Sequence, residues 1–193
     1  MATQFIPSLP PVPCREEFLA ESALAPLVAH MKALTAPPKV AQVMNWLESL
    51  DLKAEDLAPF ISYREDGYNR CQVFLTEFQE LLVLSWLPGQ VTPIHDHVFS
   101  IGAIRVVQGP AMEQRFCWTG DGRLRTGLCQ RHPTRYVAPV ERDIVHQIWN
   151  PGPGPMVTLH LYSPPLAPMN IYDPSLVLGQ ETAAPVRVPE YGD

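Results

Sequence analysis

The alternation of apolar and polar residues that begins near residue 68 constrains the fold of this chain more than any other feature of its sequence. Strands repeat every two residues, so alternating runs rich in β-branched and aromatic residues predict strands. The runs are residues 72–77, 80–86, 95–108, 113–119, 123–128, 135–138, 143–149 and 156–163. Gly120-Asp121-Gly122 is typical of a hairpin turn. Since no helical pattern alternates with these strands, we expect a mainly β, antiparallel sandwich or barrel.

The segment before the strands has a helical pattern instead. Residues 15–32 carry apolar side chains with a period near 3.6 and predict a helix. Pro37-Pro38 ends this helix and can open a second one, and residues 53–60 predict a short third helix. We therefore expect one domain over residues 1–193, with a helical leader at 15–60 packed outside a β-barrel at 61–175, and a tail at 176–193.

Composition argues against several classes of protein. The formal net charge is -6 and no basic stripe is present, which disfavours a nucleic-acid or anionic-membrane partner. The N-terminus lacks the basic and apolar regions of a signal peptide, and no window approaches the roughly 20 apolar residues of a membrane span. The 4 cysteines include no C-x-x-C pair. We expect a cytoplasmic protein that is a monomer or a weak homo-oligomer.

His95 and His97 are the first candidates for chemistry. A His-x-His pair in a strand points both imidazoles the same way, and two such imidazoles supply half of a transition-metal site. A bare His-x-His more often lies on the solvent face of a strand. Its surroundings favour the metal site, because Gly89-x5-His95-x-His97-x4-Gly102-x6-Gly109 resembles the first motif of the cupin superfamily.

The cupin resemblance also predicts the rest of the ligand set. The position of Gly102 usually holds a glutamate ligand in that motif, so its absence here implies a site of three histidines. The third is His146, because His146-x3-Asn150 matches the end of the second cupin motif, although the usual preceding Pro-x-Gly is missing. The resemblance implies a small, jelly-roll-like cupin barrel.

The run Val157-Thr-Leu-His-Leu-Tyr162 alternates cleanly between two faces. Thr158, His160 and Tyr162 share one face and can form a hydrogen-bonded row that ends in a phenol. Such a polar face alone is more often exposed to solvent. Beside a three-histidine site, we interpret it as a catalytic row.

These residues together resemble the type I cysteine dioxygenase family of thiol dioxygenases. The resemblance covers most of residues 60–175 and rests on Tyr68-Asn-Arg70, Trp86, the three histidines, and the run from Thr158 to Pro165. It implies Fe(II) held by His95, His97 and His146, and a catalytic Thr158-His160-Tyr162 row in place of the family's Ser-His-Tyr. It also implies that Arg70, with Tyr68, binds the substrate carboxylate.

The implied reaction adds both atoms of dioxygen to the sulfur of a small thiol acid. Animal members carry a cysteine at the position of Gly102 that crosslinks to the active-site tyrosine, so Tyr162 is expected to stay an ordinary phenol, as in bacterial members. Related 3-mercaptopropionate dioxygenases typically have glutamine at the position of Arg70, so Arg70 favours L-cysteine, with cysteine sulfinate as the product. An arginine fork can nevertheless hold any short carboxylate.

Two alternatives stay open beside cysteine oxidation. The first is oxidation of another thiol acid, 3-mercaptopropionate or mercaptosuccinate. The second is a non-catalytic, metal-binding cupin that acts as a sensor, which would not need Arg70 or the Thr158 row. Among the remaining reactive residues, we expect Cys71, Cys117 and Cys129 to be buried packing residues and His132 to lie exposed in a loop.

Overall fold

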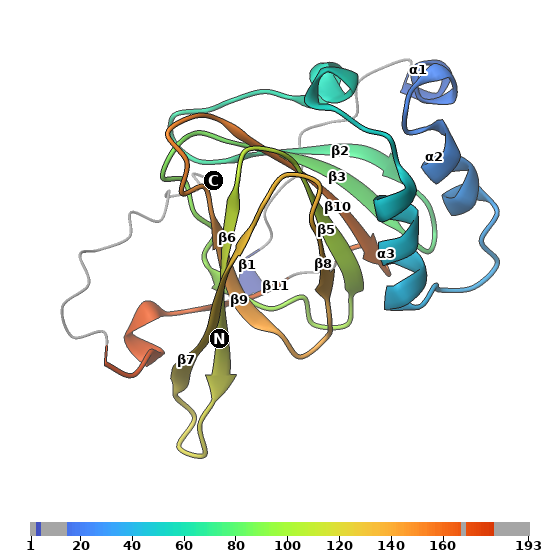
Figure 1. Cartoon of the computed structure of the whole chain (residues 1–193). Helices are drawn as coiled ribbons and strands as arrows, with labels where there is room; N and C mark the ends of the chain where they lie inside the picture. The colour runs from blue at the N-terminus through green and yellow to red at the C-terminus, as the bar shows by residue number, and fades with distance from the viewer. Residues whose placement is uncertain (1–2, 5–14, 167–168, 180–193) are drawn as a thin grey trace.

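Short helices precede all the described strands except β1, which comes before them (Figure 1). The structure is a computed structural model that describes residues 3–4, 15–166 and 169–179. Its α-helices are α1 (Arg15–Glu21), α2 (Ala25–Lys32) and α3 (Val40–Ser49). The 3-10 helices are η1 (Ala54–Phe60) and η2 (Pro174–Leu176).

The strands form two antiparallel sheets, which confirms the predicted mainly β fold (Figure 1). The 5-stranded sheet has the order β2-β3-β10-β5-β8 and the 6-stranded sheet the order β1-β11-β4-β9-β6-β7. In the first sheet the bounds are β2 Asn69–Leu75, β3 Glu80–Trp86, β5 Ile101–Gln108, β8 Val137–Val140 and β10 Met156–Ser163. In the second they are β1 Thr3–Gln4, β4 Ile94–His95, β6 Ala111–Trp118, β7 Leu124–His132, β9 Val145–Trp149 and β11 Met169–Tyr172.

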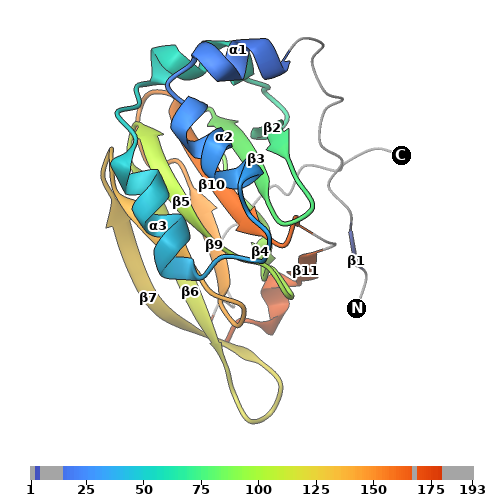
Figure 2. The ribbon, with the colours of Figure 1, turned by 90° about the vertical axis from the view of Figure 1, so that its right-hand side faces the viewer.

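The helices cover the outer face of the 5-stranded sheet, as Figure 2 shows. Leu27 of α2 and Leu47 of α3 belong to the same buried cluster as Leu159 of β10. The buried Arg105 of β5 adds a polar link, because its Nη1 donates to the carbonyl oxygens of Leu47 and Leu50 at the end of α3. A cation there complements the negative end of the helix dipole.

The inner face of the same sheet looks into the barrel. Leu82, Leu84, Ile104 and Tyr162 lie there in a second buried cluster, joined from the opposite sheet by Ile148 of β9. Strand β10 is therefore buried at every position, with its odd-numbered apolar residues toward the helices and its even-numbered residues toward the interior. The alternation expected for residues 157–162 is confirmed.

Two predicted elements are interrupted. The helix predicted over residues 15–32 is broken between α1 and α2, where the Ser22 hydroxyl donates to the Leu19 carbonyl and accepts from the Leu24 amide. The strand predicted over 95–108 is also wrong as one element. It is β4 and β5 with a turn between them, in which Val98 has a positive φ of 52°.

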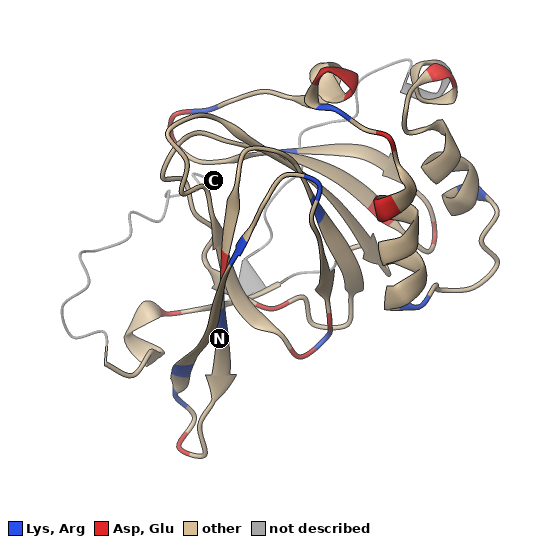
Figure 3. Cartoon of the chain, in the orientation of Figure 1, with Lys and Arg blue, Asp and Glu red and all other residues tan. Residues whose placement is uncertain are grey.

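Charged residues are dispersed. In the described part of the chain, blue and red segments alternate over loops, helices and strand ends and do not gather on one face (Figure 3). Among the described residues, no helix is long and apolar enough to cross a membrane. The assignment of the chain to one domain, with a tail beyond residue 175, stays a prediction, because residues 180–193 lie outside the described ranges.

Strands β5 and β10 approach closely at Gly102, which is paired with Tyr162. A Cβ atom at Gly102 would lie 2.1 Å from the backbone oxygen of Leu161. The neighbour is backbone and cannot rotate away, so a side chain would force the two strands apart. The close contact therefore lies next to Tyr162, which points into the barrel.

Gly102→Ala is expected to lower the free energy of unfolding by about 1 to 3 kcal/mol, the usual cost of overpacking. Urea unfolding measured at equilibrium gives this difference. Gly120→Ala is the matched control, because a Cβ atom there would meet no atom within 4 Å, and its change should stay below about 0.5 kcal/mol. Equal stability of the two variants would contradict the close approach.

Candidate metal centre

Three buried histidines converge inside the barrel. His95 ends β4, His97 follows in the turn, and His146 lies on β9 opposite His95 in the strand register. Their ring centroids are 4.7 to 5.0 Å apart, and one ligand atom of each lies within 4.8 Å of the others. The structure therefore brings together all three predicted ligands.

The hydrogen bonds of the rings leave nitrogen atoms for a cation. His95 Nδ1 lies 2.9 Å from the Pro93 carbonyl oxygen and must donate to it, so His95 Nε2 carries the free lone pair. His146 Nε2 and both nitrogens of His97 are buried without a hydrogen-bond partner. Buried polar atoms are rarely left unpaired, so His146 Nε2 and one nitrogen of His97 fit a metal ion that would accept a lone pair from each ring.

Burial keeps the imidazoles neutral. It lowers the pKa of His95 to about 3, with a further contribution from the neighbouring His146. Burial also lowers the pKa of His97 well below its ordinary value. Neutral imidazole is the form that binds metals, so the lone pairs are available at neutral pH.

Asp96 holds the turn that directs His97 inward. Its carboxylate accepts hydrogen bonds from the Val98 amide, the Asn170 side chain and the Tyr172 hydroxyl. The turn, and not an uninterrupted strand, sets the direction of His97. The expected convergence of the two histidines is confirmed, but the expected cause is wrong.

The polar row of β10 lies beside the histidines. Thr158 Oγ1 is 2.8 Å from His160 Nε2, and His160 Nδ1 is 2.9 Å from the Tyr162 hydroxyl. The Tyr162 ring stacks on His97 with centroids 5.2 Å apart. The row is buried and continuous, as the sequence predicts.

Trp86 donates into this row at its Thr158 end. Its indole Nε1 can only donate, and it donates to Thr158 Oγ1 over 3.0 Å. In the His160 tautomer with hydrogen on Nδ1, the Thr158 hydroxyl donates to His160 Nε2 and His160 Nδ1 donates to the Tyr162 oxygen. Burial lowers the pKa of His160 and raises the pKa of Tyr162, so the ring stays neutral and the phenol keeps its proton. That proton is the one left to point away from the row.

One small cavity of about 30 Å³ joins these groups. Its polar lining includes Arg70 and Tyr68 together with histidines of the trio and the row. The remaining lining is largely apolar: Leu82, Leu84, Ile148, Leu166 and Met169. The structure thus places the two predicted substrate-binding residues in the same cavity as the candidate metal centre.

Arg70 lies next to a carboxylate that sequence reasoning missed. Its Nη2 is 3.6 Å from Glu80 Oε2, and its Nε is buried without a hydrogen-bond partner. Glu80 also accepts from Gln72 Nε2 and from the Leu166 amide. The available signal was Glu80 itself, the one acid at the start of an otherwise apolar run.

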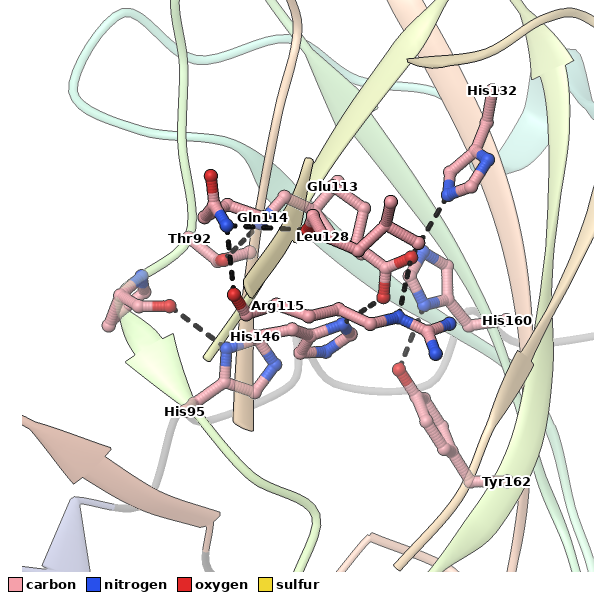
Figure 4. A network of polar contacts seen from close by, with 12 residues as sticks. Thr92, His95, Glu113, Gln114, Arg115, Leu128, His132, His146, His160 and Tyr162 are labelled. Atoms are coloured by element: carbon pink, nitrogen blue, oxygen red, sulfur yellow. Dashed lines mark hydrogen bonds and ion pairs between the residues drawn. The ribbon is translucent and has the colours of Figure 1, made fainter. Parts of the chain in front are cut away.

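Glu113 and His132 were also missed. His132 is buried, so its predicted exposure is wrong, and its Nε2 lies 3.0 Å from Glu113 Oε2. Glu113 Oε1 lies 2.7 Å from His146 Nδ1, which places the carboxylate between the two rings (Figure 4). The predicted burial of Cys117 and Cys129 is wrong as well, since both are exposed, whereas Cys71 is buried in the outer cluster as expected.

Comparisons with known proteins identify the family of the chain. A family profile described as cysteine dioxygenase type I matches residues 14–175. Cysteine dioxygenase type 1 of Danio rerio is 29% identical over 141 residues, covering 69% of this chain and 70% of that protein. The Rattus norvegicus protein of the same name is 27% identical over 174 residues, covering 82% of this chain and 83% of its own length.

A solved structure supports the fold. It is a protein of Klebsiella pneumoniae with a double-stranded β-helix domain, and it matches with a TM-score of 0.51 at 19% identity. The match covers 60% of this chain and 87% of that one. At this identity the likeness concerns the fold alone.

The stability of the metal-free protein is expected to fall in mild acid. His95, His97 and His160 bind protons in the unfolded chain below pH about 6.5 but resist them when folded, because their folded pKa values are lowered. The unfolded state then binds more protons, so the free energy of unfolding falls as pH drops below about 6.5, by up to roughly 1.4 kcal/mol per pH unit for each histidine.

Urea unfolding of chelator-treated protein between pH 7.5 and 5.5 measures this slope. Over that range ordinary carboxylates stay ionised, which leaves the histidines as the main source. His160→Gln should reduce the slope by up to one proton. An unchanged slope in that variant would contradict the buried, neutral state of His160.

Proposed function

The chain belongs to the cysteine dioxygenase type I family, and from this membership we propose that it is an Fe(II)-dependent thiol dioxygenase that converts L-cysteine to cysteine sulfinate. The observation that carries the proposal is one cavity lined by His95 and His146 of the trio, by the end of the polar row and by the largely buried Arg70. The expected cytoplasmic location and weak or absent self-association stay predictions.

His95, His97 and His146 would hold the iron through the lone pairs that the barrel leaves unpaired. Bound Fe(II) would offer open positions to a thiolate and dioxygen, so that both oxygen atoms can be transferred to sulfur without an external reductant. The protein's part is to orient the substrate, to place a proton beside the reacting atoms and to limit access of water.

Arg70 and Tyr68 would orient the substrate. The unpaired Nε of Arg70 gives a carboxylate a charge-assisted partner, while Nη2 stays beside Glu80. Tyr68 stacks on Trp86 with centroids 4.4 Å apart, which fixes the wall next to the arginine. Holding the carboxylate here would keep the thiol near the trio, and catalysis would come largely from positioning.

Tyr162 would supply the proton. In the His160 tautomer with hydrogen on Nδ1, the phenol oxygen would accept from His160, and its own hydrogen would stay free for a partner in the cavity. A hydrogen-bond donor fixed in a desolvated site can stabilise charge that develops on oxygen or sulfur. Among the described cysteines, Cys117 and Cys129 are exposed and Cys71 packs on the outer face of the sheet, which supports an uncrosslinked phenol.

Glu80 weighs on the choice among thiol acids. With its carboxylate 3.6 Å from Arg70 Nη2, it offsets part of the positive charge that a substrate meets. A monocarboxylate can still be bound by Arg70, whereas the second carboxylate of mercaptosuccinate would gain little and face a like charge. This arrangement favours a monocarboxylic thiol. Between cysteine and 3-mercaptopropionate, the residue at position 70 favours cysteine, because related 3-mercaptopropionate dioxygenases typically have glutamine there.

The sensor alternative is less well supported. A metal-binding sensor has no use for a buried, polarised row ending at the metal centre, and such a row costs stability unless it is fully bonded. Thr158, His160 and Tyr162 are nonetheless buried together.

The Fe(II)-loaded protein is expected to consume oxygen in the presence of L-cysteine and to form cysteine sulfinate. His146→Ala should abolish oxygen uptake and most iron binding, because it removes one ligand of the trio. His30→Ala, which changes an exposed histidine of α2, is the matched control and should keep both. An oxygen electrode and iron analysis give the two readouts, and full iron content in His146→Ala would remove that residue from the ligand set.

Arg70→Ala is expected to lower kcat/KM for cysteine at least about thirtyfold, because a partly buried charge-assisted contact contributes roughly 2 to 5 kcal/mol. Arg70→Gln should narrow or invert the preference for cysteine over 3-mercaptopropionate, since glutamine keeps a donor and loses the charge. Arg125→Ala, on the exposed face of β7, serves as the control.

Competition among equal concentrations of cysteine, 3-mercaptopropionate and mercaptosuccinate tests the substrate directly. Cysteine should be consumed first. If another thiol acid has a kcat/KM about tenfold above that of cysteine, the cysteine assignment fails while the dioxygenase proposal stands.

A further inference from the structure

Glu113 is a buried carboxylate at the back of the metal centre, and the reaction proposed above makes no use of it. Its side chain is 3% exposed, and each of its two oxygens meets a different imidazole (Figure 4). Oε1 lies 2.7 Å from His146 Nδ1, and Oε2 lies 3.0 Å from His132 Nε2. Arg115 Nε is 3.3 Å from Oε2. The partners of this carboxylate are therefore two imidazole nitrogens and one guanidinium nitrogen.

The carboxylate is held in its charged form. Donors meet both of its oxygens, and the guanidinium of Arg115 lies 3.3 Å from Oε2, so the surroundings favour the ionised carboxylate. An ionised carboxylate can only accept hydrogen bonds, so His146 Nδ1 must carry the hydrogen between them. His146 Nε2, which has no hydrogen-bond partner, is left with its lone pair toward His95 and His97.

The strand register makes this arrangement rigid. Glu113 and Arg115 sit on β6 directly opposite Ile148 and His146 of β9, so the acid and the ligand are diagonal neighbours in one sheet. His132 ends β7 on the other side of β6, and its ring stacks on Tyr136 with centroids 4.6 Å apart. Glu113 is thus fixed from both neighbouring strands, and the ring of His146 inherits that orientation.

The charge of Glu113 also bears on the ligand set. The three histidines supply three nitrogen ligands and no carboxylate. Gly102 occupies the position at which the cupin motif usually has a carboxylate ligand. A carboxylate bonded to the far side of a ligating imidazole makes that ring a stronger donor and places negative charge one ring away from the cation.

We propose that Glu113 is a positioning residue of the metal centre: it fixes the tautomer and orientation of His146 and supplies, through that ring, the negative charge that the ligand set lacks. His132 holds the second oxygen and keeps the carboxylate aimed at His146. The inference rests on the proposed metal site and not on the reaction, so it is tested by metal binding.

Glu113→Gln is the sharpest variant, because the amide keeps the size of the side chain and an oxygen that can accept from His146 while it removes the charge. The affinity for Zn(II), measured by competition with a chromogenic chelator, should fall about 10-fold to 100-fold relative to the unmodified protein. Glu141→Gln, at an exposed acid in the turn before β9, is the matched control and should leave the affinity unchanged.

The Fe(III)/Fe(II) midpoint potential distinguishes loss of the negative charge of Glu113 from loss of its packing. Negative charge near the metal favours Fe(III) over Fe(II), so Glu113→Gln should weaken Fe(III) binding at least about tenfold more than Fe(II) binding, which is a rise of about 59 mV in the midpoint potential. Loss of packing alone would weaken both oxidation states equally. Glu113→Asp keeps the charge but withdraws the carboxylate from His146, and it provides the affinity test if Glu113→Gln does not fold.

Zn(II) affinity of a folded Glu113→Gln protein within about twofold of the unmodified protein would overturn the inference, and so would an unchanged midpoint potential. Failure of the unmodified protein to bind Zn(II) or iron would instead overturn the metal site itself, and this inference with it. Normal metal binding without oxygen consumption would remove the proposed reaction and leave the role of Glu113 intact.

Discussion

Desolvation of polar side chains inside an apolar barrel is the constraint on which the rest of the site depends. Imidazoles, a threonine, a tyrosine and two carboxylates are buried there, and each costs free energy unless its polar atoms are bonded. Most find partners: the Pro93 carbonyl, Glu113, the indole of Trp86 and one another. The imidazole nitrogens left without partners include those that converge between His95, His97 and His146. The convergence of these imidazoles, and not an unpaired atom by itself, therefore marks the place where a metal ion would bind.

The same constraint explains why carboxylates accompany the cationic groups. Glu80 stands beside Arg70, and Glu113 stands beside Arg115. Each acid lowers the cost of burying its neighbour and fixes its orientation at the same time. The barrel thus contains two charge pairs, one beside the cavity at Arg70 and one behind the candidate metal centre at Glu113.

The parts of this arrangement that could be predicted from sequence are those with a short, fixed period. The bounds of β10 follow from alternation, those of β3 from a nearly continuous apolar run, and the histidine trio from motif spacing. The turn after His95 could not be predicted in this way, because Val98 adopts a positive φ that its residue type disfavours and that the bonds to Asp96 maintain. Likewise, Glu113 and His132 meet only through the pairing of β6 with its neighbours, which a periodic pattern does not specify.

Strand β10 carries two sets of demands on eight consecutive residues, since its odd positions pack against the helices and its even positions form the polar row. An insertion or deletion of one residue within it would exchange the faces, driving His160 into the helix interface and a leucine into the cavity. Fold and site would then be lost in one event. Insertions and deletions are therefore tolerated only in the flanking turns, such as the proline- and glycine-rich segment at 151–155. Within β10, only substitutions preserve the two faces of the strand.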